Sequence, residues 1–181
     1  MRERSLRLSP QFQLNIGTGF SRDHNHTQWF GNFADDAGVT HYSFAHLEQR
    51  TTSMTVRVNY TMTPELTLEL YGQPFVSTGV YSDFRETGAT PGAASYDARF
   101  RPYTPPPTED TRFKVTELIT NSVLRWEYRP GSTLFVVWQH GRHGPGPNDR
   151  FYQSWMRDYR ELFRLHPDNT FLVKVAYWVS G

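Results

Sequence analysis

Histidine and carboxylate side chains are the groups in this chain whose types and spacing could do chemistry. Asp23, His24 and His26 lie in one polar segment, while His140 and His143 flank a glycine-rich one. A metal site needs three or four ligands at suitable spacing, and neither group has a further ligand that the spacing fixes. We therefore expect no bound metal at either place.

Adjacent carboxylates occur twice, at Asp35-Asp36 and Glu109-Asp110. Neighbouring side chains of an extended chain point to opposite faces, so neither pair predicts the facing carboxylates of a glycoside hydrolase. The chain has no cysteine, and it lacks the serine-hydrolase, zinc-protease and phosphate-loop motifs. We expect no catalytic residue and no cofactor.

The composition favours a single β-rich domain over the whole of residues 1–181. Aromatic residues make up 15% of the chain and apolar residues only 37%, which is typical of strands that are apolar on one face. The formal net charge of +1 does not indicate a nucleic-acid partner. The first residues lack the apolar region of a signal peptide, so the chain is either soluble or the C-terminal piece of a longer protein.

Alternation of apolar and polar residues predicts an all-β fold, an antiparallel meander of about seven strands. One short amphipathic helix is expected at 153–165, before the last strand, and a long loop without regular structure at 83–112. Ser21–His26 is expected to be a connection, and Pro10 to interrupt the first strand. The expected strands are Leu6–Ile16, Thr27–Phe33, His41–Met62, Leu66–Val76, Phe113–Arg129, Thr133–His140 and Phe171–Val179.

Two hairpins set the expected register. A three-residue loop at Thr63-Pro64-Glu65 would pair Met62 with Leu66. A second three-residue loop at Pro130-Gly131-Ser132 would pair Arg129 with Thr133, and hence Trp126 with Val136. In both hairpins this register places the apolar residues of the two strands on one face.

The two faces of these strands admit two interpretations. A half-solvated sheet, as in a soluble sandwich or a small lipocalin-like barrel, alternates in this way. A transmembrane barrel does so too, with lipid outside and water inside. Thr52–Met62 has the roughly 9–11 residues that span a bilayer, and both short turns fall at one end of the meander. We therefore favour the C-terminal part of a membrane barrel.

The barrel interpretation assigns each alternating residue to lipid or to the lumen. The expected lipid-facing residues are Met54, Val56, Val58, Tyr60, Met62, Leu66, Leu68, Leu70, Leu124, Trp126, Tyr128, Val136, Trp138, Val173, Val175 and Tyr177. The expected lumen-facing residues are Arg57, Asn59, Glu69, Gln73, Arg125, Glu127 and Lys174.

Three long strings carry a family resemblance: "YTMTPELTLELYGQPFVSTGVYSDF" (Tyr60–Phe84), "NSVLRWEYRPGSTLFVVW" (Asn121–Trp138) and "LFRLHPDNTFLVKVAYWVSG" (Leu162–Gly181). They resemble the C-terminal domain of unknown function of the bacterial carbohydrate-binding family 9 domain-containing proteins. The resemblance implies an outer-membrane β-barrel, and a glycan partner bound by an N-terminal domain that is missing from this chain.

We therefore expect a non-enzymatic segment in the bacterial outer membrane, with the lipid bilayer as its partner. It would act as a pore, a surface anchor or a carrier of a glycan-binding domain. One alternative is a soluble all-β module that binds a ligand with Trp155, Tyr159 and the loop at 83–112. Another is an accessory part of a carbohydrate-active hydrolase.

Overall fold

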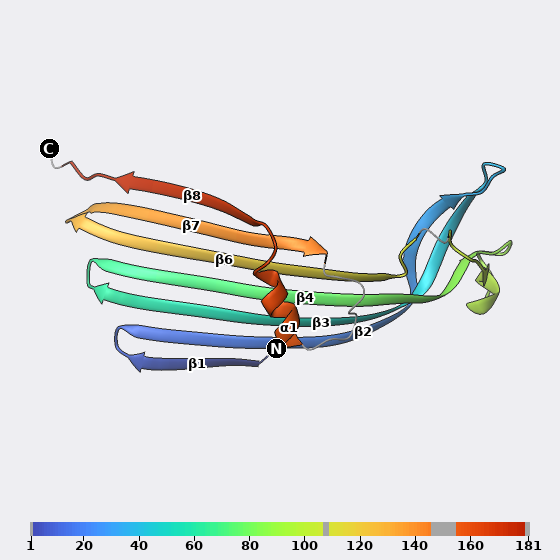
Figure 1. Cartoon of the computed structure of the whole chain (residues 1–181), viewed down its shortest axis with the longest axis horizontal. Helices are drawn as coiled ribbons and strands as arrows, with labels where there is room; N and C mark the ends of the chain where they lie inside the picture. Colours follow the sequence, from blue (N-terminus) through green and yellow to red (C-terminus); the bar gives the residue numbers. More distant parts are fainter. Residues whose placement is uncertain (1, 107–108, 146–154, 180–181) are drawn as a thin grey trace. The chain divides into compact units, whose positions relative to one another are not determined.

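The computed structural model describes residues 2–106, 109–145 and 155–179. Within them the chain forms strands, a 3-10 turn and one short α-helix (Figure 1). In chain order the elements are β1 (Arg2–Ser9), β2 (Phe12–Ala34), β3 (Thr40–Thr63), β4 (Leu66–Thr87), η1 (Asp97–Arg99), β5 (Phe100–Pro102), β6 (Arg112–Arg129), β7 (Ser132–Pro145), α1 (Trp155–Leu162) and β8 (Pro167–Ala176).

The strands form one sheet in the order β1-β2-β3-β4-β6-β7-β8, and β5 pairs with β4 as an eighth strand among the described residues. This order confirms the predicted all-β antiparallel meander with a short helix before the last strand. Within the described residues no pairing joins β1 to β8, so the sheet is open and these strands are its edges (Figure 1).

The chain divides into two compact units. Unit 1 comprises Met1–Phe20, Thr51–Ser77 and Val115–Gly181, and unit 2 comprises Ser21–Arg50 and Thr78–Lys114. Strands β2, β3, β4 and β6 each contribute residues to both units. The short hairpin turns belong to unit 1, while the connection between β2 and β3 and the one containing β5 belong to unit 2. The single domain expected over 1–181 stays a prediction.

The first predicted strand is a hairpin, because Pro10 and Gln11 form its turn. β1 ends at Ser9 and β2 begins at Phe12, with Leu6 opposite Leu14. Proline fixes φ near −65° and has no N–H to donate, which suits a turn better than a strand interior. The N–H of Gln11 donates to Oγ of Ser9 at 3.2 Å. Apolar and polar residues continue to alternate across Pro10 and Gln11, so the sequence pattern did not reveal the turn.

The predicted connection Ser21–His26 lies inside β2 and is wrong. β2 runs without a break for 23 residues. The segment is polar, but it contains neither glycine nor proline, the residues that most strongly interrupt a strand. Its polarity indicated exposure to water rather than an end to strand pairing.

The register of the β6–β7 hairpin differs from the prediction by two residues along the ladder and by one residue at the turn. Trp126 faces Leu134 rather than Val136, and Arg129 faces Ser132 rather than Thr133. The register shifts between Glu127 and Arg129, and a two-residue turn at Pro130-Gly131 follows. Gly131 has a φ of 74°, which favours glycine. A shift of two keeps each side chain on its expected face.

The region 83–112 contains more regular structure than we predicted. β4 continues to Thr87, and β5 pairs with it through Arg85 opposite Pro102. The short β5 carries proline at an edge of the sheet, where no ladder hydrogen bond is lost. The 83–112 segment is therefore partly an extension of the sheet rather than a loop without structure.

The last helix and strand are shifted from their predicted bounds. α1 is described from Trp155 to Leu162, and the predicted start at Gln153 lies outside the described residues. Pro167, Asp168 and Asn169 were expected to form a turn, but they are the first residues of β8 and face Arg142, Gly141 and His140. β8 consequently begins and ends earlier than the predicted Phe171–Val179.

Few large apolar side chains are buried in either unit. In unit 2 the buried apolar residues among those described are Ala45 and Leu47, and in unit 1 they are Val76, Leu118 and Leu162. Many aromatic and aliphatic side chains of the unit 1 strands remain exposed instead. This exposed surface is the first candidate for a functional site.

Candidate functional site

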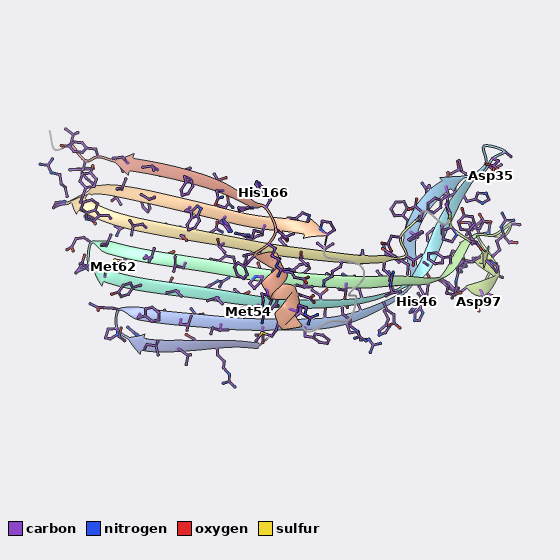
Figure 2. All side chains as sticks on the ribbon, in the orientation of Figure 1. Asp35, His46, Met54, Met62, Asp97 and His166 are labelled. Atoms are coloured by element: carbon purple, nitrogen blue, oxygen red, sulfur yellow. The ribbon has the colours of Figure 1, made fainter. Side chains whose placement is uncertain are left out.

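The expected lipid-facing side chains divide into a half-buried set and an exposed set, and all of them belong to unit 1. Met54 and Met62 mark the two ends of the run on β3 (Figure 2). The half-buried members are Met54, Val56, Val58, Leu66, Leu68, Leu124, Tyr128 and Val136. The exposed members are Tyr60, Met62, Leu70, Trp126, Trp138, Val173, Val175 and Tyr177.

The most exposed apolar members of this set are Val173 and Val175 of β8 and Tyr177 directly after it, and β7 pairs with β8. Val173 faces Val136 and Val175 faces Leu134. Trp138 faces Phe171, and their rings stack with centroids 5.8 Å apart and planes only 3° apart. Phe171, Val173 and Val175 of β8 and Trp138 of β7 therefore form an exposed apolar surface.

The expected lumen-facing residues make polar contacts with one another on the opposite face. The guanidinium of Arg57 lies over the ring of Tyr71, 5.4 Å from its centroid. Tyr71 in turn donates its hydroxyl hydrogen to Gln73 at 2.7 Å. Arg125 and Glu127 form an ion pair at 3.3 Å. The Arg57–Tyr71 contact agrees with the expected pairing of these strands, although the pairing of Met62 with Leu66 stays a prediction.

Three of the expected lumen-facing residues are exposed to solvent. Asn59, Glu69 and Lys174 are exposed, and Lys174 faces Phe135 in the β7–β8 ladder. The guanidinium of Arg57 thus contacts Tyr71, the residue opposite it in the register that Met62 and Leu66 were expected to set. The assignment of both faces to lipid and lumen stays a prediction.

The segment after α1 packs on the apolar face of β7. A Cβ on Gly144 would lie 3.0 Å from the side chain of Leu165. Arg142 donates hydrogen bonds to the carbonyl oxygens of Phe163 at 2.5 Å and Leu165 at 2.7 Å. Gly144 and Arg142 share a face with Trp138, since alternate residues of a strand point the same way. Placement of the Trp155 side chain lies outside the described residues.

The histidines near the end of β7 do not converge. His140 Nδ1 lies 2.9 Å from Oδ1 of Asn169, and Arg142 donates to its Nε2 at 3.0 Å. His143 is exposed and faces Glu117 in the ladder. Being three residues apart on one strand, the two rings point to opposite faces.

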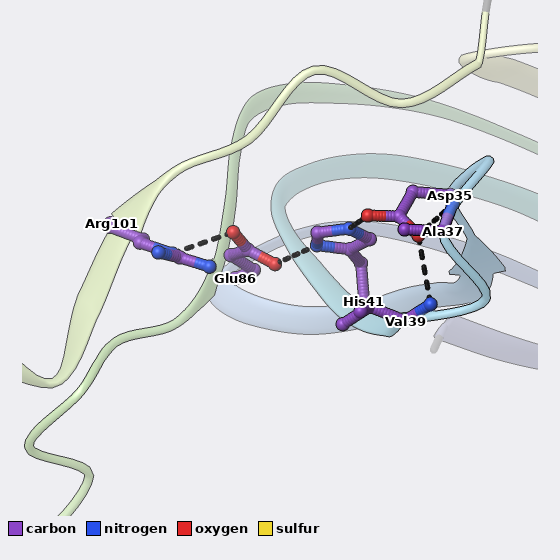
Figure 3. Close-up of polar contacts among 6 residues, drawn as sticks. All are labelled: Asp35, Ala37, Val39, His41, Glu86 and Arg101. Atoms are coloured by element: carbon purple, nitrogen blue, oxygen red, sulfur yellow. Dashed lines mark hydrogen bonds and ion pairs between the residues drawn. The ribbon is translucent and has the colours of Figure 1, made fainter.

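Unit 2 contains a polar network that joins four parts of the chain (Figure 3). His41 of β3 has Nδ1 2.5 Å from Oε2 of Glu86 on β4, and Nε2 3.5 Å from Oδ2 of Asp35. Glu86 also forms an ion pair with Arg101 of β5, whose Nε lies 2.6 Å from Oε1 of Glu86. Asp35 precedes the turn between β2 and β3, and it accepts from the N–H groups of Ala37 and Val39.

The network shifts the pKa values of its members. The hydrogen bond to Glu86 raises the pKa of His41 above 6.5, with a smaller contribution from Asp35. The backbone N–H of Val39 lowers the pKa of Asp35, since it stabilises the carboxylate. The ring of Tyr103 stacks on His41 at 5.1 Å. Burial raises the pKa of the Tyr103 hydroxyl, with Glu86 and Asp35 adding to the effect.

This network holds the strands together and is poorly arranged for catalysis. Both ring nitrogens of His41 are directed at carboxylates, so neither is left to act on a substrate. No sequence signal connected Glu86 with His41, because 45 residues separate them and only the strand order brings them together. Asp35, from one of the two adjacent carboxylate pairs, belongs to this network, whereas Asp110 of the other pair accepts from the N–H of Arg112.

The histidines of β2 acquire neighbours that the sequence did not reveal. His24 Nδ1 lies 3.9 Å from Oε1 of Glu48, and the ring of His26 lies 4.9 Å from that of His46. Asp23 accepts from the hydroxyl of Ser21 and, as an adjacent residue, points to the other face.

A family model described as a domain of unknown function (DUF5916) matches residues 2–180. No curated protein matches the chain, and no solved structure does. Among the described residues, no helix is long and apolar enough to cross a membrane.

Proposed function

The chain belongs to the family described as a domain of unknown function (DUF5916), and we propose that it forms a non-enzymatic segment of a bacterial outer-membrane β-barrel. It would act as a pore, a surface anchor or a carrier of a glycan-binding domain. The glycan association rests on the resemblance to carbohydrate-binding family 9 domain-containing proteins. The membrane association rests on the surface of unit 1.

The exposed apolar surface of β7 and β8 is the observation that carries this proposal. Val173, Val175 and Phe171 lie side by side on consecutive outward positions of β8, each more than 60% exposed. Large contiguous apolar patches are unusual on proteins that stay monomeric in water. Lipid is the solvent that makes such a surface favourable, because hydrocarbon carries no cost for contact with valine or phenylalanine.

The open edges of the sheet constrain the proposal. In hydrocarbon an unpaired N–H or C=O costs several kcal/mol, so a β-sheet crosses a bilayer only as a closed barrel. β1 and β8 must therefore be paired in the membrane, with each other or with further strands. A pore needs a closed barrel as well. The barrel hypothesis therefore requires that β1 and β8 have strand partners in the membrane.

The strand lengths indicate which parts of the chain could lie within the bilayer. β8 has 10 residues, which agrees with the roughly 9–11 residues of a spanning strand. β2, β3 and β4 have 22 to 24 residues and are too long to lie wholly within hydrocarbon. In our proposal the unit 1 portions of these strands cross the bilayer and the unit 2 portions extend into water.

The helix α1 has the character of a helix that lies at a membrane surface. Arg157, Arg160 and Met156 of α1 are exposed, and so are Phe163 and Arg164 directly after it. Helices with a basic face and an apolar face bind at the boundary between headgroups and hydrocarbon. Packing beside the apolar face of β7 is consistent with such a position at the rim of the barrel.

The same packing favours a second candidate, a soluble all-β binding module. Leu162 is only 1% exposed, so α1 and the residues after it cover part of the apolar face. A soluble sandwich would use a helix in this way. The two candidates differ in what covers the rest of that face, which is lipid in one case and a ligand or partner in the other.

Single-cysteine labelling separates the two candidates, and the chain has no native cysteine to interfere. Val56→Cys and Val58→Cys test one face of β3, and Arg57→Cys and Asn59→Cys test the other. In vesicles we expect a lipid-phase probe to react at positions 56 and 58 and a water-soluble thiol reagent to react at 57 and 59. Positions 57 and 59 serve as controls because they lie on the same strand and point to the opposite face.

Two results would count against the membrane barrel. One is equal access of the water-soluble reagent to all four cysteines in vesicles. The other is a monodisperse chain that needs no detergent and unfolds cooperatively as a monomer. Either would leave the soluble module as the better account of the apolar face.

A further inference from the structure

Four metal-ligating side chains gather on one face of unit 2. The candidate ligand atoms of His24, His46 and Glu48 all lie within 4.8 Å of one another. The ring of His26 stands 4.9 Å from the ring of His46, measured between centroids. His46 lies on the part of β3 that belongs to unit 2 (Figure 2).

The alternation of β-strands explains why these side chains share a face. His24 and His26 are two residues apart on β2, and His46 and Glu48 are two residues apart on β3. Residues two apart point to the same side of a strand. Adjacent strands then place a His-x-His pair beside a His-x-Glu pair, which supplies three imidazoles and one carboxylate.

We propose that His24, His46 and Glu48 bind a divalent transition-metal ion, with Zn²⁺ as the best match and His26 as the fourth ligand. Imidazole nitrogen and carboxylate oxygen are common zinc ligands, and four of them satisfy its tetrahedral preference. Hard cations such as Ca²⁺ and Mg²⁺ prefer sites made entirely of oxygen ligands. The three histidines therefore select against them.

The side chains have the freedom to close around an ion. Ligand atoms in a tetrahedral zinc site stand about 3.4 Å apart, so the most distant pair among His24, His46 and Glu48 needs to approach by up to about 1.4 Å. His24 and Glu48 have exposed side-chain fractions of 43% and 39%, which leaves room for this rotation. Arg22 holds the other carboxylate oxygen of Glu48 at 3.4 Å, and such an outer partner orients a ligating carboxylate.

A metal here would tie β2 to β3 on the face opposite the His41 network. His41 and His46 differ in parity on β3, so the two groups of side chains lie on different sides of the strand. This inference does not rest on the membrane proposal, since unit 2 holds all four ligands. It replaces our sequence-based expectation of no metal at His24 and His26, which rested on the lack of further ligands.

Zinc titration of the whole tag-free chain tests the site. The chain is freed of metal with a chelator and titrated with Zn²⁺ in a calorimeter, in whichever medium keeps it dispersed. We expect one ion per chain, and binding at least about tenfold weaker in His46→Ala and in Glu48→Gln. His143→Ala, which removes an exposed histidine of unit 1, is the matched control and should bind like the unaltered chain.

Cobalt provides a signal that a merely structural role of these residues would not produce. Co²⁺ in place of Zn²⁺ should give visible absorption bands of tetrahedral coordination in the unaltered chain, and His24→Ala should weaken them. His24→Ala removes an exposed ring, so it keeps the test decisive if His46→Ala fails to fold. The proposal is overturned if the unaltered chain binds no stoichiometric Zn²⁺. It is equally overturned if His46→Ala and Glu48→Gln bind normally, or if His143→Ala loses binding to the same extent.

Discussion

Replacing Val173 by arginine distinguishes water from lipid on the outer face of β8. Val173 is 64% exposed and faces Val136, which is near the middle of the predicted spanning part of β7. Its neighbour Leu172 is 54% exposed and points to the other face. The two positions are thus matched in exposure and differ in parity.

The expected cost of Val173→Arg depends on the solvent. In water an exposed substitution changes the free energy of unfolding by about 0.5 kcal/mol or less. In a bilayer an arginine on the lipid face costs roughly 2–4 kcal/mol near the midplane and less near an interface. That range corresponds to a roughly 30- to 700-fold change in the folding equilibrium constant. Leu172→Arg should cost less than about 1 kcal/mol in either medium, because its face keeps contact with water.

Urea titration of the chain in lipid vesicles measures both free energies of unfolding. Tryptophan fluorescence reports the transition, since Trp138 lies on β7, which pairs with β8, and Trp126 lies on β6, the next strand of the sheet. We expect Val173→Arg to lower the midpoint by much more than Leu172→Arg does. Equal tolerance of the two substitutions, within about 0.5 kcal/mol, would refute a lipid-facing β8.

Two further predictions concern unit 2. Replacing Glu86 by glutamine removes the main cause of the raised His41 pKa, so an NMR titration should find a lower pKa for that imidazole; an unchanged value would contradict the network. The stabilisation from protonated His41 is fully present below pH 6.5 and is lost as pH rises through the raised pKa, so Glu86→Gln should flatten the stability profile over that range. Gly79→Ala would drive a methyl group into the ring of Phe113 and to 3.0 Å from Leu47, and we expect a loss of about 1–3 kcal/mol in urea unfolding. Gly92→Ala, where nothing lies within 4 Å, should leave unfolding nearly unchanged, and equal effects would contradict the close packing of Gly79.

The alternation of side chains predicted the class of fold and the order of the strands because it depends on local sequence alone. Leu66, Leu68 and Leu70 on one strand and Leu124 and Trp126 on another set the period of two. The same pattern could not locate the turn at Pro10, since the alternation continues through it. It also could not reveal that Ser21–His26 is strand, since polar residues occur in strands whose surroundings are water.

The candidate sites depend on register, which the sequence specified only weakly. Glu48 lies beside His24, and Glu86 lies beside His41, each on a neighbouring strand. The two residues of these pairs are 24 and 45 positions apart in the sequence. Nothing in the spacing of these residues fixed which of them would be opposite one another. The β6–β7 hairpin shows the same limit, because a bulge near Tyr128 moved the pairing by two residues without altering the pattern of faces.

The two units differ in the side chains that they expose and pair, and each difference suits the solvent that our proposal gives the unit. Unit 1 leaves valine, phenylalanine and tryptophan exposed on β7 and β8, a surface that gains from hydrocarbon and loses in water. Unit 2 joins its strands through the ion pairs of Asp35, His41, Glu86 and Arg101, and partly exposed pairs of this kind respond to salt and pH. Removing lipid should therefore affect unit 1 first, whereas changes of pH and ionic strength should act mainly on unit 2. An ion bound at the proposed metal site would link β2 to β3. It would stabilise unit 2 without any contribution from the membrane.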